Sequence, residues 1–338
     1  MAPITLSVII PCFNEERTIE ELLRAIYAQT FPMAQMEVII ADGLSTDRTR
    51  ERIAAFQAGH PQLIIKVVDN HQRTIPAALN QAIAASQGEI LTRMDAHAVP
   101  APDYIEKSVS RLRDGYGENV GGVINIKPGK EDWIGQAIAV ATSHPLGVGD
   151  ARYRWTKSAG EADTVAFGTY RRSLIDQIGG YDETLRINED YEFNNRIRRA
   201  GGKIWVDPAI KVDYYSRPTL RSLAKQYFSY GFWKYKMLRR FPDTLRWRQA
   251  LPPVFVSGVL VLLLLSTFWI PARYILLFVL SSYLVILLAG AVKPAMHRKN
   301  LTLILSIPLA IMTMHFSWGC GFLWSLAKNI ILGSQNDD

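Results

Sequence analysis

The chain has 338 residues, of which 49% are hydrophobic and 20% are charged, and its formal net charge is +7. Its length allows one large domain with additional segments, or two domains. The two cysteines, Cys12 and Cys320, are far apart and exclude a disulfide framework or a cysteine-based metal cluster, whereas the positive charge favours an anionic partner such as a nucleotide-bearing substrate, a nucleic acid or a membrane surface.

The first hundred residues predict strands that alternate with helices. Short apolar, β-branched runs indicate buried strands, and segments with polar or capping first residues indicate the helices that follow them. The expected strands are 6–10, 37–41, 63–68 and 89–94, and the expected helices are 14–29, 48–58 and 76–86. This alternation is typical of βαβ units, so we expect an α/β fold with a mostly parallel sheet.

Polar segments follow three of these strands where each strand ends. They are Pro11–Glu15, Asp42–Asp47 and Asp95–His97. Because ligands of open α/β sheets bind at the carboxyl ends of the strands, this edge predicts a binding site. No glycine-rich dinucleotide motif or P-loop follows any of the strands. Phosphate groups would therefore have to be held by a metal ion rather than by a glycine-rich cradle.

The segment Leu91–His97 is an apolar run that ends on a carboxylate and an imidazole. If the run is a strand, Asp95 and His97 point to the same side and could share a divalent cation. A single D-x-H pair is more often a turn with a polar aspartate and a surface histidine. The choice between these interpretations depends on the rest of the chain.

Two later segments predict helices of different character. Residues 188–199 have an acidic first turn and a basic last turn, which complementarity with the helix dipole alone could explain. Residues 218–241 are amphipathic and rich in aromatic and basic side chains, which suits a helix lying in a membrane interface, although an ordinary packed helix would share the pattern. The side chains expected to face the membrane or an acceptor there are Trp233, Lys234, Arg239 and Arg240.

The composition becomes strongly apolar from Leu251 onward, and three segments are long enough to cross a bilayer. They are 252–270, 274–292 and 301–326. Lysine and arginine residues crowd before the first segment and between the second and third, so the positive-inside rule places the preceding domain in the cytoplasm, at the inner membrane. Alternatively, the very short link Pro271–Arg273 could mark a re-entrant hairpin, in which the first two segments do not each cross the membrane. The expected division is 1–217, 218–250 and 251–328.

Six short motifs follow one another before the membrane segments: Ser7–Glu15, Ala41–Asp47, Met94–His97, Phe167–Thr169, Gly179–Glu183 and Asn188–Phe193. In this order they resemble the successive signatures of family 2 glycosyltransferases, which have the GT-A fold. The Arg73–Asn80 stretch, the Asp-Ala-His variant and the terminal spans look most like the bacterial exopolysaccharide branch. In that branch, succinoglycan-type glucosyltransferases extend a lipid-linked sugar.

The resemblance implies a Rossmann-like GT-A domain followed by a transmembrane helical region, and it implies roles for particular residues. Asp42 matches the carboxylate that contacts the base, and the segment that includes Pro11, Phe13 and Glu15 matches the loop beneath the nucleotide. Asp95 matches the first carboxylate of the D-x-D motif, which holds a metal on the diphosphate. His97 replaces the second carboxylate, and Asp190 matches the general base, with Glu189 beside it.

An imidazole ligand favours Mn²⁺, with Mg²⁺ as the alternative. It also implies that activity falls as His97 protonates, near an unperturbed pKa of about 6.5. The implied function is an inverting, metal-dependent hexosyltransferase that moves glucose from UDP-glucose onto a lipid-linked saccharide. The alternatives are a polyprenyl-phosphate sugar synthase and a non-catalytic membrane scaffold with a nucleotide-binding fold. Nucleic-acid binding is not expected, because the basic residues crowd toward the spans.

Overall fold

The computed structural model describes residues 3–332 and divides the chain into two compact units. Unit 1 consists of Met1–Asn125 and Ala151–Tyr214, and unit 2 consists of Ile126–Asp150 and Tyr215–Asp338. The segment 126–150 thus belongs to the unit that contains the apolar C-terminal helices, which the sequence did not indicate. The division at residues 217 and 250 stays a prediction.

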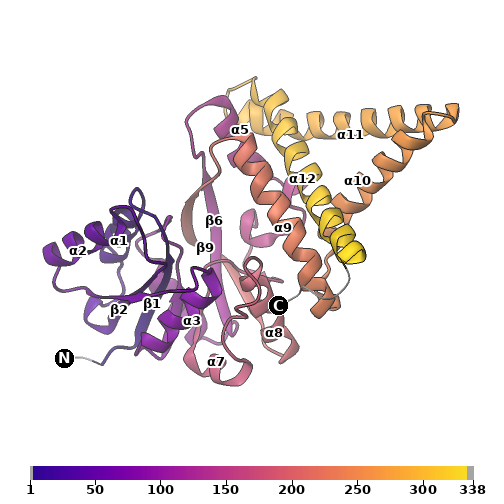
Figure 1. Cartoon of the computed structure of the whole chain (residues 1–338). Helices are drawn as coiled ribbons and strands as arrows, with labels where there is room; N and C mark the ends of the chain where they lie inside the picture. Colours follow the sequence, from indigo (N-terminus) through magenta and orange to yellow (C-terminus); the bar gives the residue numbers. More distant parts are fainter. Residues whose placement is uncertain (1–2, 333–338) are drawn as a thin grey trace. The chain divides into compact units, whose positions relative to one another are not determined.

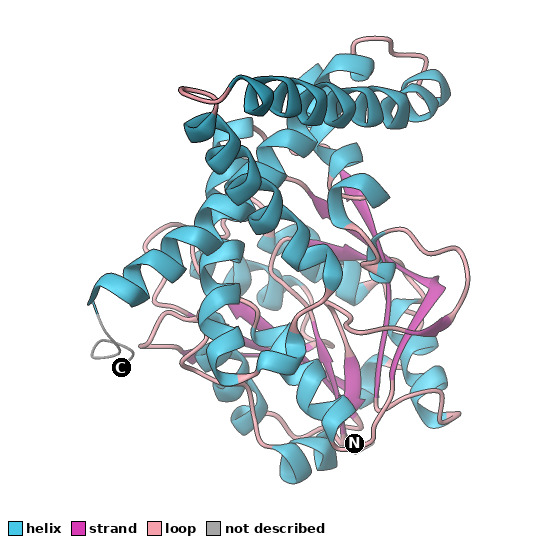
Figure 2. Ribbon diagram, turned by 90° about the vertical axis from the view of Figure 1, so that its right-hand side faces the viewer, coloured by secondary structure: helices cyan, strands magenta, loops and turns pink. Residues whose placement is uncertain are grey.

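Unit 1 is built around a nine-stranded mixed sheet, drawn as magenta arrows in Figure 2. The strand order is β3-β2-β1-β4-β8-β6-β9-β5, and β7 pairs with β9. In chain order the strands are β1 (Leu6–Cys12), β2 (Met36–Asp42), β3 (Ile64–Asp69), β4 (Ile90–Arg93), β5 (Ala98–Pro100), β6 (Asn119–Lys127), β7 (Gly160–Glu161), β8 (Thr169–Arg171) and β9 (Ile204–Tyr215).

The predicted strands form the parallel half of the sheet. β1 pairs in parallel with β2 and β4, and β2 pairs in parallel with β3. Apolar residues on both faces of β1 are fully buried, as expected for a strand covered on both sides. The helices of this half are α1 (Ile19–Tyr27), α2 (Thr49–Gly59), α3 (Ile75–Ala85) and α4 (Tyr104–Arg113), and a 3₁₀ turn, η1 (Met33–Gln35), precedes β2. α3 packs on β1 and β2 (Figure 1).

One predicted helix start was wrong. The helix expected from Asn14 begins at Ile19, because Asn14 has a φ of +54°, in the left-handed region. The amide groups of Thr18 and Ile19 donate to the carbonyl oxygen of Glu15. Residues 13–18 therefore form a loop after β1, and this loop contributes to the site described below.

The second half of the sheet is antiparallel, which the sequence did not indicate. β8 pairs antiparallel with both β4 and β6, and β9 pairs antiparallel with β5 and β7. The connecting elements in unit 1 are η2 (Arg152–Arg154), α7 (Arg172–Ile178) and α8 (Glu189–Arg199). Phe193 of α8 stacks on Tyr181 and contacts Tyr170, with ring centroids 4.6 and 5.2 Å apart. This aromatic core fixes the start of α8 near the end of β4.

Unit 2 is helical and contains three helices that are long and apolar enough to cross a membrane. They are α10 (Trp247–Leu265), α11 (Ile270–His297) and α12 (Leu303–Leu332), coloured orange to yellow in Figure 1. The remaining elements are α5 (Trp133–Ala141), α6 (Pro145–Val148), α9 (Leu220–Arg240) and η3 (Pro242–Thr244). Large apolar side chains such as Leu264, Phe278 and Val285 are exposed on α10 and α11, as suits contact with lipid.

The core of unit 2 is formed by α5, α9, α11 and α12. Small and branched side chains interlock there, and they include Ala137, Leu223, Ala291, Ala310 and Ile311. α9 and α12 approach each other closely at two glycines. A Cβ added at Gly231 would lie 2.1 Å from the carbonyl oxygen of Trp318, and one added at Gly321 would lie 2.1 Å from that of Phe228.

The close approach of α9 and α12 predicts the effect of enlarging Gly231. Gly231→Val should lower the free energy of unfolding by about 1–3 kcal/mol, because the backbones must separate to admit the side chain. Gly258 of α10 is a matched control, since a Cβ added there would meet nothing within 4 Å. Thermal unfolding in detergent should show a lowered Tm for Gly231→Val and no lowering of Tm for Gly258→Val. An unchanged Tm for Gly231→Val would contradict the close contact.

Candidate active site

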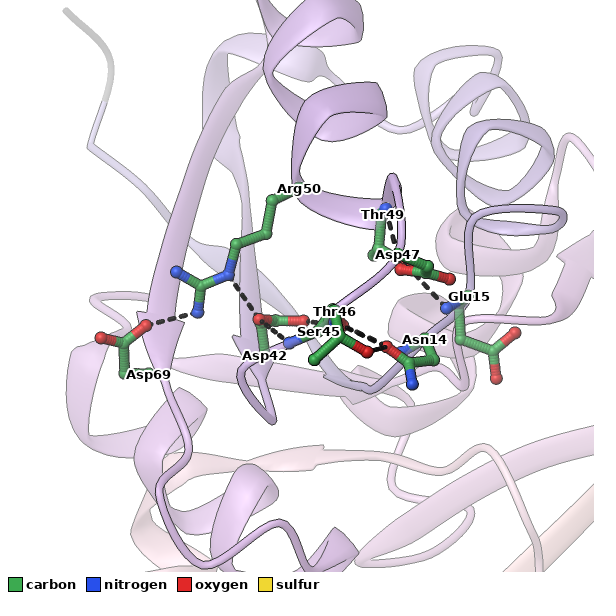
Figure 3. Close-up of polar contacts among 9 residues, drawn as sticks. All are labelled: Asn14, Glu15, Asp42, Ser45, Thr46, Asp47, Thr49, Arg50 and Asp69. Carbon is green, nitrogen blue, oxygen red and sulfur yellow. Dashed lines mark hydrogen bonds and ion pairs between the residues drawn. The ribbon is translucent and has the colours of Figure 1, made fainter.

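The loops that follow β1 and β2 are bound to each other at the carboxyl edge of the sheet (Figure 3). The amide group of Asn14 donates to Oγ of Ser45, and the amide group of Thr46 donates to Oδ1 of Asn14, each at 2.8 Å. The amide group of Glu15 donates to Oγ1 of Thr49, also at 2.8 Å. These reciprocal bonds make the edge a fixed rim rather than two independent loops.

Asp42, at the end of β2, is fully buried below this rim. Its Oδ2 accepts hydrogen bonds from the amide group of Ser45 at 3.0 Å and from Nε of Arg50 at 2.5 Å, and its Oδ1 accepts from the Ser45 hydroxyl. Arg50 also pairs with Asp69 at the end of β3 (Figure 3). The side chain of Arg50 is 42% exposed, so a ligand at this edge meets the guanidinium before it meets Asp42.

Phe13 presents an exposed aromatic ring on the same rim. Its side chain is 45% exposed, and the guanidinium carbon of Arg73 lies 5.8 Å from the ring centroid. Gly43 leaves room for this ring, since a Cβ there would lie 3.0 Å from it. Pro11 is partly buried within β1. Arg73 was not among the predicted site residues, although its position in the loop after β3 could have indicated it.

Asp95 and His97 do not continue a strand. The structure ends β4 at Arg93, and the amide group of Ala98 donates to the carbonyl oxygen of Asp95 at 3.0 Å, which closes a turn. The prediction that these two side chains share a side because they alternate along a strand was therefore wrong. Their directions are set instead by the separate partners that each one has in the folded unit.

His97 is held between Glu15 and Tyr214. Its Nδ1 lies 3.0 Å from Oε1 of Glu15, and its Nε2 lies 3.1 Å from the Tyr214 hydroxyl. Burial raises the pKa of Glu15, but hydrogen bonds from His97 and Thr18 outweigh it and leave the pKa below its ordinary value. An ionised Glu15 favours the tautomer with the proton on Nδ1, which leaves the lone pair on Nε2.

Arg93 connects Asp95 to the start of α8. Its Nε and Nη2 donate to Oδ1 of Asp95 at 3.3 and 3.2 Å, and its Nη2 donates to Oε1 of Glu189 at 2.9 Å. The side chains of Arg93 and Glu189 are only 6% and 7% exposed. The guanidinium of Arg93 thus joins Asp95 and Glu189. The sequence singled out both residues, although they lie 94 positions apart (189 − 95).

Glu189 and Asp190 form an acidic pair at the first turn of α8. Asn188 precedes the helix with a φ of +71°, and Oδ1 of Asp190 accepts a hydrogen bond from the amide group of Tyr191 at 2.7 Å. Burial raises the pKa of both carboxyl groups above the ordinary values, and the charge of Arg93 opposes that shift only in part. A carboxylate with a raised pKa is a stronger base than an exposed aspartate.

A family model described as glycosyl transferase family 2 matches residues 7–179, which carry the rim, Arg93, Asp95 and His97. The chain belongs to glycosyl transferase family 2.

Two curated relatives extend the similarity over nearly the whole of this glycosyltransferase. A dolichyl N-acetyl-α-D-glucosaminyl phosphate 3-β-D-2,3-diacetamido-2,3-dideoxy-β-D-glucuronosyltransferase of Methanococcus voltae is 28% identical, over 96% of this chain and 97% of the relative. The succinoglycan biosynthesis protein ExoA of Rhizobium meliloti is 29% identical, over 93% of each chain. The chain is therefore a transferase enzyme, as the sequence predicted.

The fold of the glycosyltransferase is also that of a solved structure. The mannosyltransferase PcManGT from Pyrobaculum calidifontis, in complex with GDP-Man and Mn²⁺, has a TM-score of 0.63 and 20% identity, over 96% of this chain and 88% of that chain. At this identity the likeness concerns the fold alone. It confirms the expected GT-A architecture with a helical C-terminal region.

The residues that were expected to face a membrane or an acceptor belong to α9 of unit 2. Arg239 and Arg240 are exposed at the end of the helix, and Trp233 is partly buried, with Nζ of Lys236 5.1 Å from its ring centroid. Lys234 is different, since its side chain is fully buried and its Nζ donates to the carbonyl oxygen of Thr244 at 3.0 Å. Burial excludes Lys234 from the side chains that could face a membrane, whereas that role stays a prediction for the other three residues.

Proposed function

We propose that this glycosyltransferase is inverting and metal-dependent, and that it moves glucose from UDP-glucose onto a lipid-linked saccharide at the cytoplasmic face of the inner membrane. The observation that carries the proposal is the acidic pair of the buried Glu189 and the partly buried Asp190, which Arg93 joins through Glu189 to Asp95. It connects a candidate base and a candidate donor-side carboxylate within unit 1.

Asp190 is the proposed general base, because a sugar hydroxyl is a weak nucleophile at neutral pH. Its carboxylate accepts the acceptor hydroxyl proton while the hydroxyl oxygen forms a bond to the anomeric carbon. The bond from that carbon to the donor phosphate oxygen breaks, and the nucleoside diphosphate leaves with the electron pair. A single displacement from the opposite face inverts the anomeric centre, through a transition state with oxocarbenium character.

The residues around Asp95 suit a divalent cation. Oδ1 of Asp95 is occupied by Arg93, whereas its Oδ2 has no hydrogen-bond donor among residues 3–332. Asp95, Glu189 and Asp190 together bring three carboxyl groups to one guanidinium, which can balance the charge of only one of them. The carboxylate of Asp95 and Nε2 of His97 would hold the cation. Among the described residues, no group of three or more His, Cys, Asp or Glu side chains is arranged to bind a metal ion.

A bound divalent cation would neutralise the charge that develops on the leaving diphosphate. The imidazole and the carboxylate together favour Mn²⁺ over Mg²⁺. His97 would exchange its contact with the Tyr214 hydroxyl for the cation, while Glu15 keeps the imidazole oriented. The Mn²⁺ in the PcManGT complex supports this choice of ion.

The proposed nucleotide site is the rim formed by the loops after β1 and β2, together with the end of β3. The exposed ring of Phe13 can stack on a base, and Arg50 with Asp42 supplies polar groups at the base edge. The choice of uracil and glucose rests on the resemblance of the sequence motifs to succinoglycan-type glucosyltransferases, and the GDP-Man complex of PcManGT makes the guanine nucleotide the natural competitor.

A lipid-linked saccharide is the proposed acceptor. The name of the Methanococcus voltae relative specifies a dolichyl N-acetylglucosaminyl phosphate and a 3-β linkage, and the similarity spans nearly the whole chain. The exposed Arg239 and Arg240 of α9 and the three apolar helices fit a site of action at an anionic membrane surface. An undecaprenyl-phosphate 4-deoxy-4-formamido-L-arabinose transferase of Pseudomonas aeruginosa, 28% identical, supports the rival acceptor, a bare polyprenyl phosphate, but covers only 51% of this chain.

The proposal is tested by incubating the membrane-embedded protein with Mn²⁺, a panel of nucleotide sugars and two acceptor classes. We expect transfer from UDP-glucose to a polyprenyl-linked saccharide. Transfer only to polyprenyl phosphate would support the synthase, whose acceptor needs no base. Nucleotide binding without any turnover across the panel would support the scaffold.

The role of His97 predicts a change in metal preference. His97→Ala should weaken Mn²⁺ binding in the presence of UDP by about tenfold or more and remove the preference over Mg²⁺, because a nitrogen ligand is lost. Mn²⁺ binding can be followed by the loss of the free-ion electron paramagnetic resonance signal. His297→Ala, at the exposed end of α11, is the control. Unchanged affinity in His97→Ala would leave Asp95 as the only ligand of the motif.

A further inference from the structure

Arg93 is a buried cation whose side-chain hydrogen bonds all go to two acidic residues of the site. Its backbone is fixed in the sheet, since its amide group donates to the carbonyl oxygen of Gly168 at 2.9 Å. Its Nε and Nη2 contact only Asp95 and Glu189, and Nη1 is buried with no hydrogen-bond partner in the described part of the chain. A guanidinium with an unsatisfied buried donor is costly, which is more typical of a functional site than of a stabilising core.

The two carboxylates that Arg93 joins belong to different halves of the proposed site. Asp95 lies in the turn after β4, on the proposed donor side. Glu189 is the first residue of α8, immediately before the proposed base Asp190. The helix start itself follows a left-handed residue, Asn188, so the direction of Asp190 depends on how the first turn of α8 is held.

We infer that Arg93 is a positioning residue that sets the position of the proposed base Asp190 relative to the donor-side carboxylate Asp95. The inference rests on the proposed function, in which a donor held at Asp95 reacts with a hydroxyl activated by Asp190. The planar guanidinium suits this task because it holds two carboxylates in a fixed geometry, whereas an ammonium acts as a point charge. The catalytic step itself needs no contact between Arg93 and the substrate.

The geometry predicts separate effects on turnover and on donor binding. Without Arg93 the site loses one positive charge and Asp95 retains its carboxyl group, so the attraction for a metal–diphosphate remains. The alignment of the base with the donor is lost, and a misplacement of about 1 Å can cost about 100-fold in rate. Arg93→Met should therefore lower kcat by about 100-fold and change the donor KM by no more than about threefold.

Three further variants distinguish positioning from a structural role. Arg93→Lys should recover part of the lost kcat, since an ammonium can reach one carboxylate. Glu189→Gln should lower kcat less than Arg93→Met does, because the glutamine side-chain oxygen can still accept a hydrogen bond from Nη2 of Arg93. Arg93→Met combined with Glu189→Gln removes the buried pair together, so it should fold better than Arg93→Met alone and still have a low kcat. Arg111→Met, which breaks an ion pair with the buried Asp207 elsewhere in unit 1, is the control.

The experiment measures kcat and KM for UDP-glucose with Mn²⁺ and a polyprenyl-linked saccharide, together with UDP affinity and Tm, for the full membrane-embedded chain. A low kcat with near-unchanged KM and UDP affinity, partly recovered by lysine, is the expected result. Full recovery of kcat in the double variant, or a rise in KM that accounts for the whole loss, would overturn the inference. Failure of the wild-type protein to transfer glucose would instead contradict the proposed donor and acceptor.

Discussion

Replacing Asp190 with asparagine should abolish sugar transfer while leaving UDP binding nearly intact. The amide cannot take up a proton from the acceptor hydroxyl, and the loss of a general base typically lowers kcat by about 10²–10⁴-fold. UDP should still bind because Asp42, at the end of β2, and Arg50, on α2, lie on other elements than α8. The measurements are kcat in the transfer assay and the UDP dissociation constant by calorimetry.

Two comparisons make the test of Asp190 specific. Asp176→Asn removes an exposed carboxylate from α7 of the same unit and should leave both kcat and the UDP dissociation constant unchanged. In the unchanged protein, kcat should fall on acidification at a pH above the ordinary aspartate pKa of about 3.9, because burial raises the pKa of Asp190 and the protonated form is no base. Equal losses of UDP binding and transfer in Asp190→Asn would contradict the assignment.

Replacing Asp95 with asparagine should remove the metal-dependent part of donor binding. An asparagine oxygen can still accept a hydrogen bond from Arg93, so the change mainly removes the charge that would face the cation. Metal stabilisation of a diphosphate is worth several kcal/mol, which corresponds to a loss of about 10²–10³-fold in UDP affinity with Mn²⁺ present.

Chelation provides the control for Asp95. With the metal removed, the unchanged protein and Asp95→Asn should bind UDP equally weakly, since the rim contacts remain in both. Calorimetric titrations with and without Mn²⁺ give the four affinities that are needed. If Mn²⁺ strengthened UDP binding to Asp95→Asn as much as to the unchanged protein, Asp95 would not be a metal ligand.

The parallel half of the sheet was predictable because its strands are short apolar runs between polar loops, buried in β1, β2 and β4 and partly exposed in β3. Hydrophobic pattern gives the existence of such a strand but not its last hydrogen bond, so the end of β4 was placed one residue too late. That residue matters, because it places Asp95 and His97 in a turn. The antiparallel half depends on pairing between distant segments such as β6 and β8, which local pattern does not report.

Arg93 was missed, although the sequence contained a signal for it. An arginine inside an otherwise buried strand needs a partner, because an unpaired charge is too costly in a core. The sequence alone could not name Glu189 as that partner, since the two lie 96 positions apart. Their contact follows from the aromatic packing of Tyr181 and Phe193, which places the start of α8 beside β4.

Lys234 shows a different limit of sequence reasoning. The amphipathic pattern of α9 was enough to predict the helix, which the structure confirms at Leu220–Arg240. The pattern does not report which basic side chain finds an internal partner, and the carbonyl oxygen of Thr244 in the following turn provides one for Lys234. Arg239 and Arg240, by contrast, are exposed at the end of the helix, as the sequence predicted for a polar face.

The most direct test of the central claim is the anomeric configuration of the product formed from UDP-α-glucose. The membrane-embedded protein is incubated with this donor, Mn²⁺ and a polyprenyl-linked saccharide, and the new linkage is assigned by the proton coupling constant of the transferred sugar. A β-linked glucose on the saccharide, with release of UDP, is the result that a single displacement assisted by Asp190 predicts. An α-linked product would contradict it.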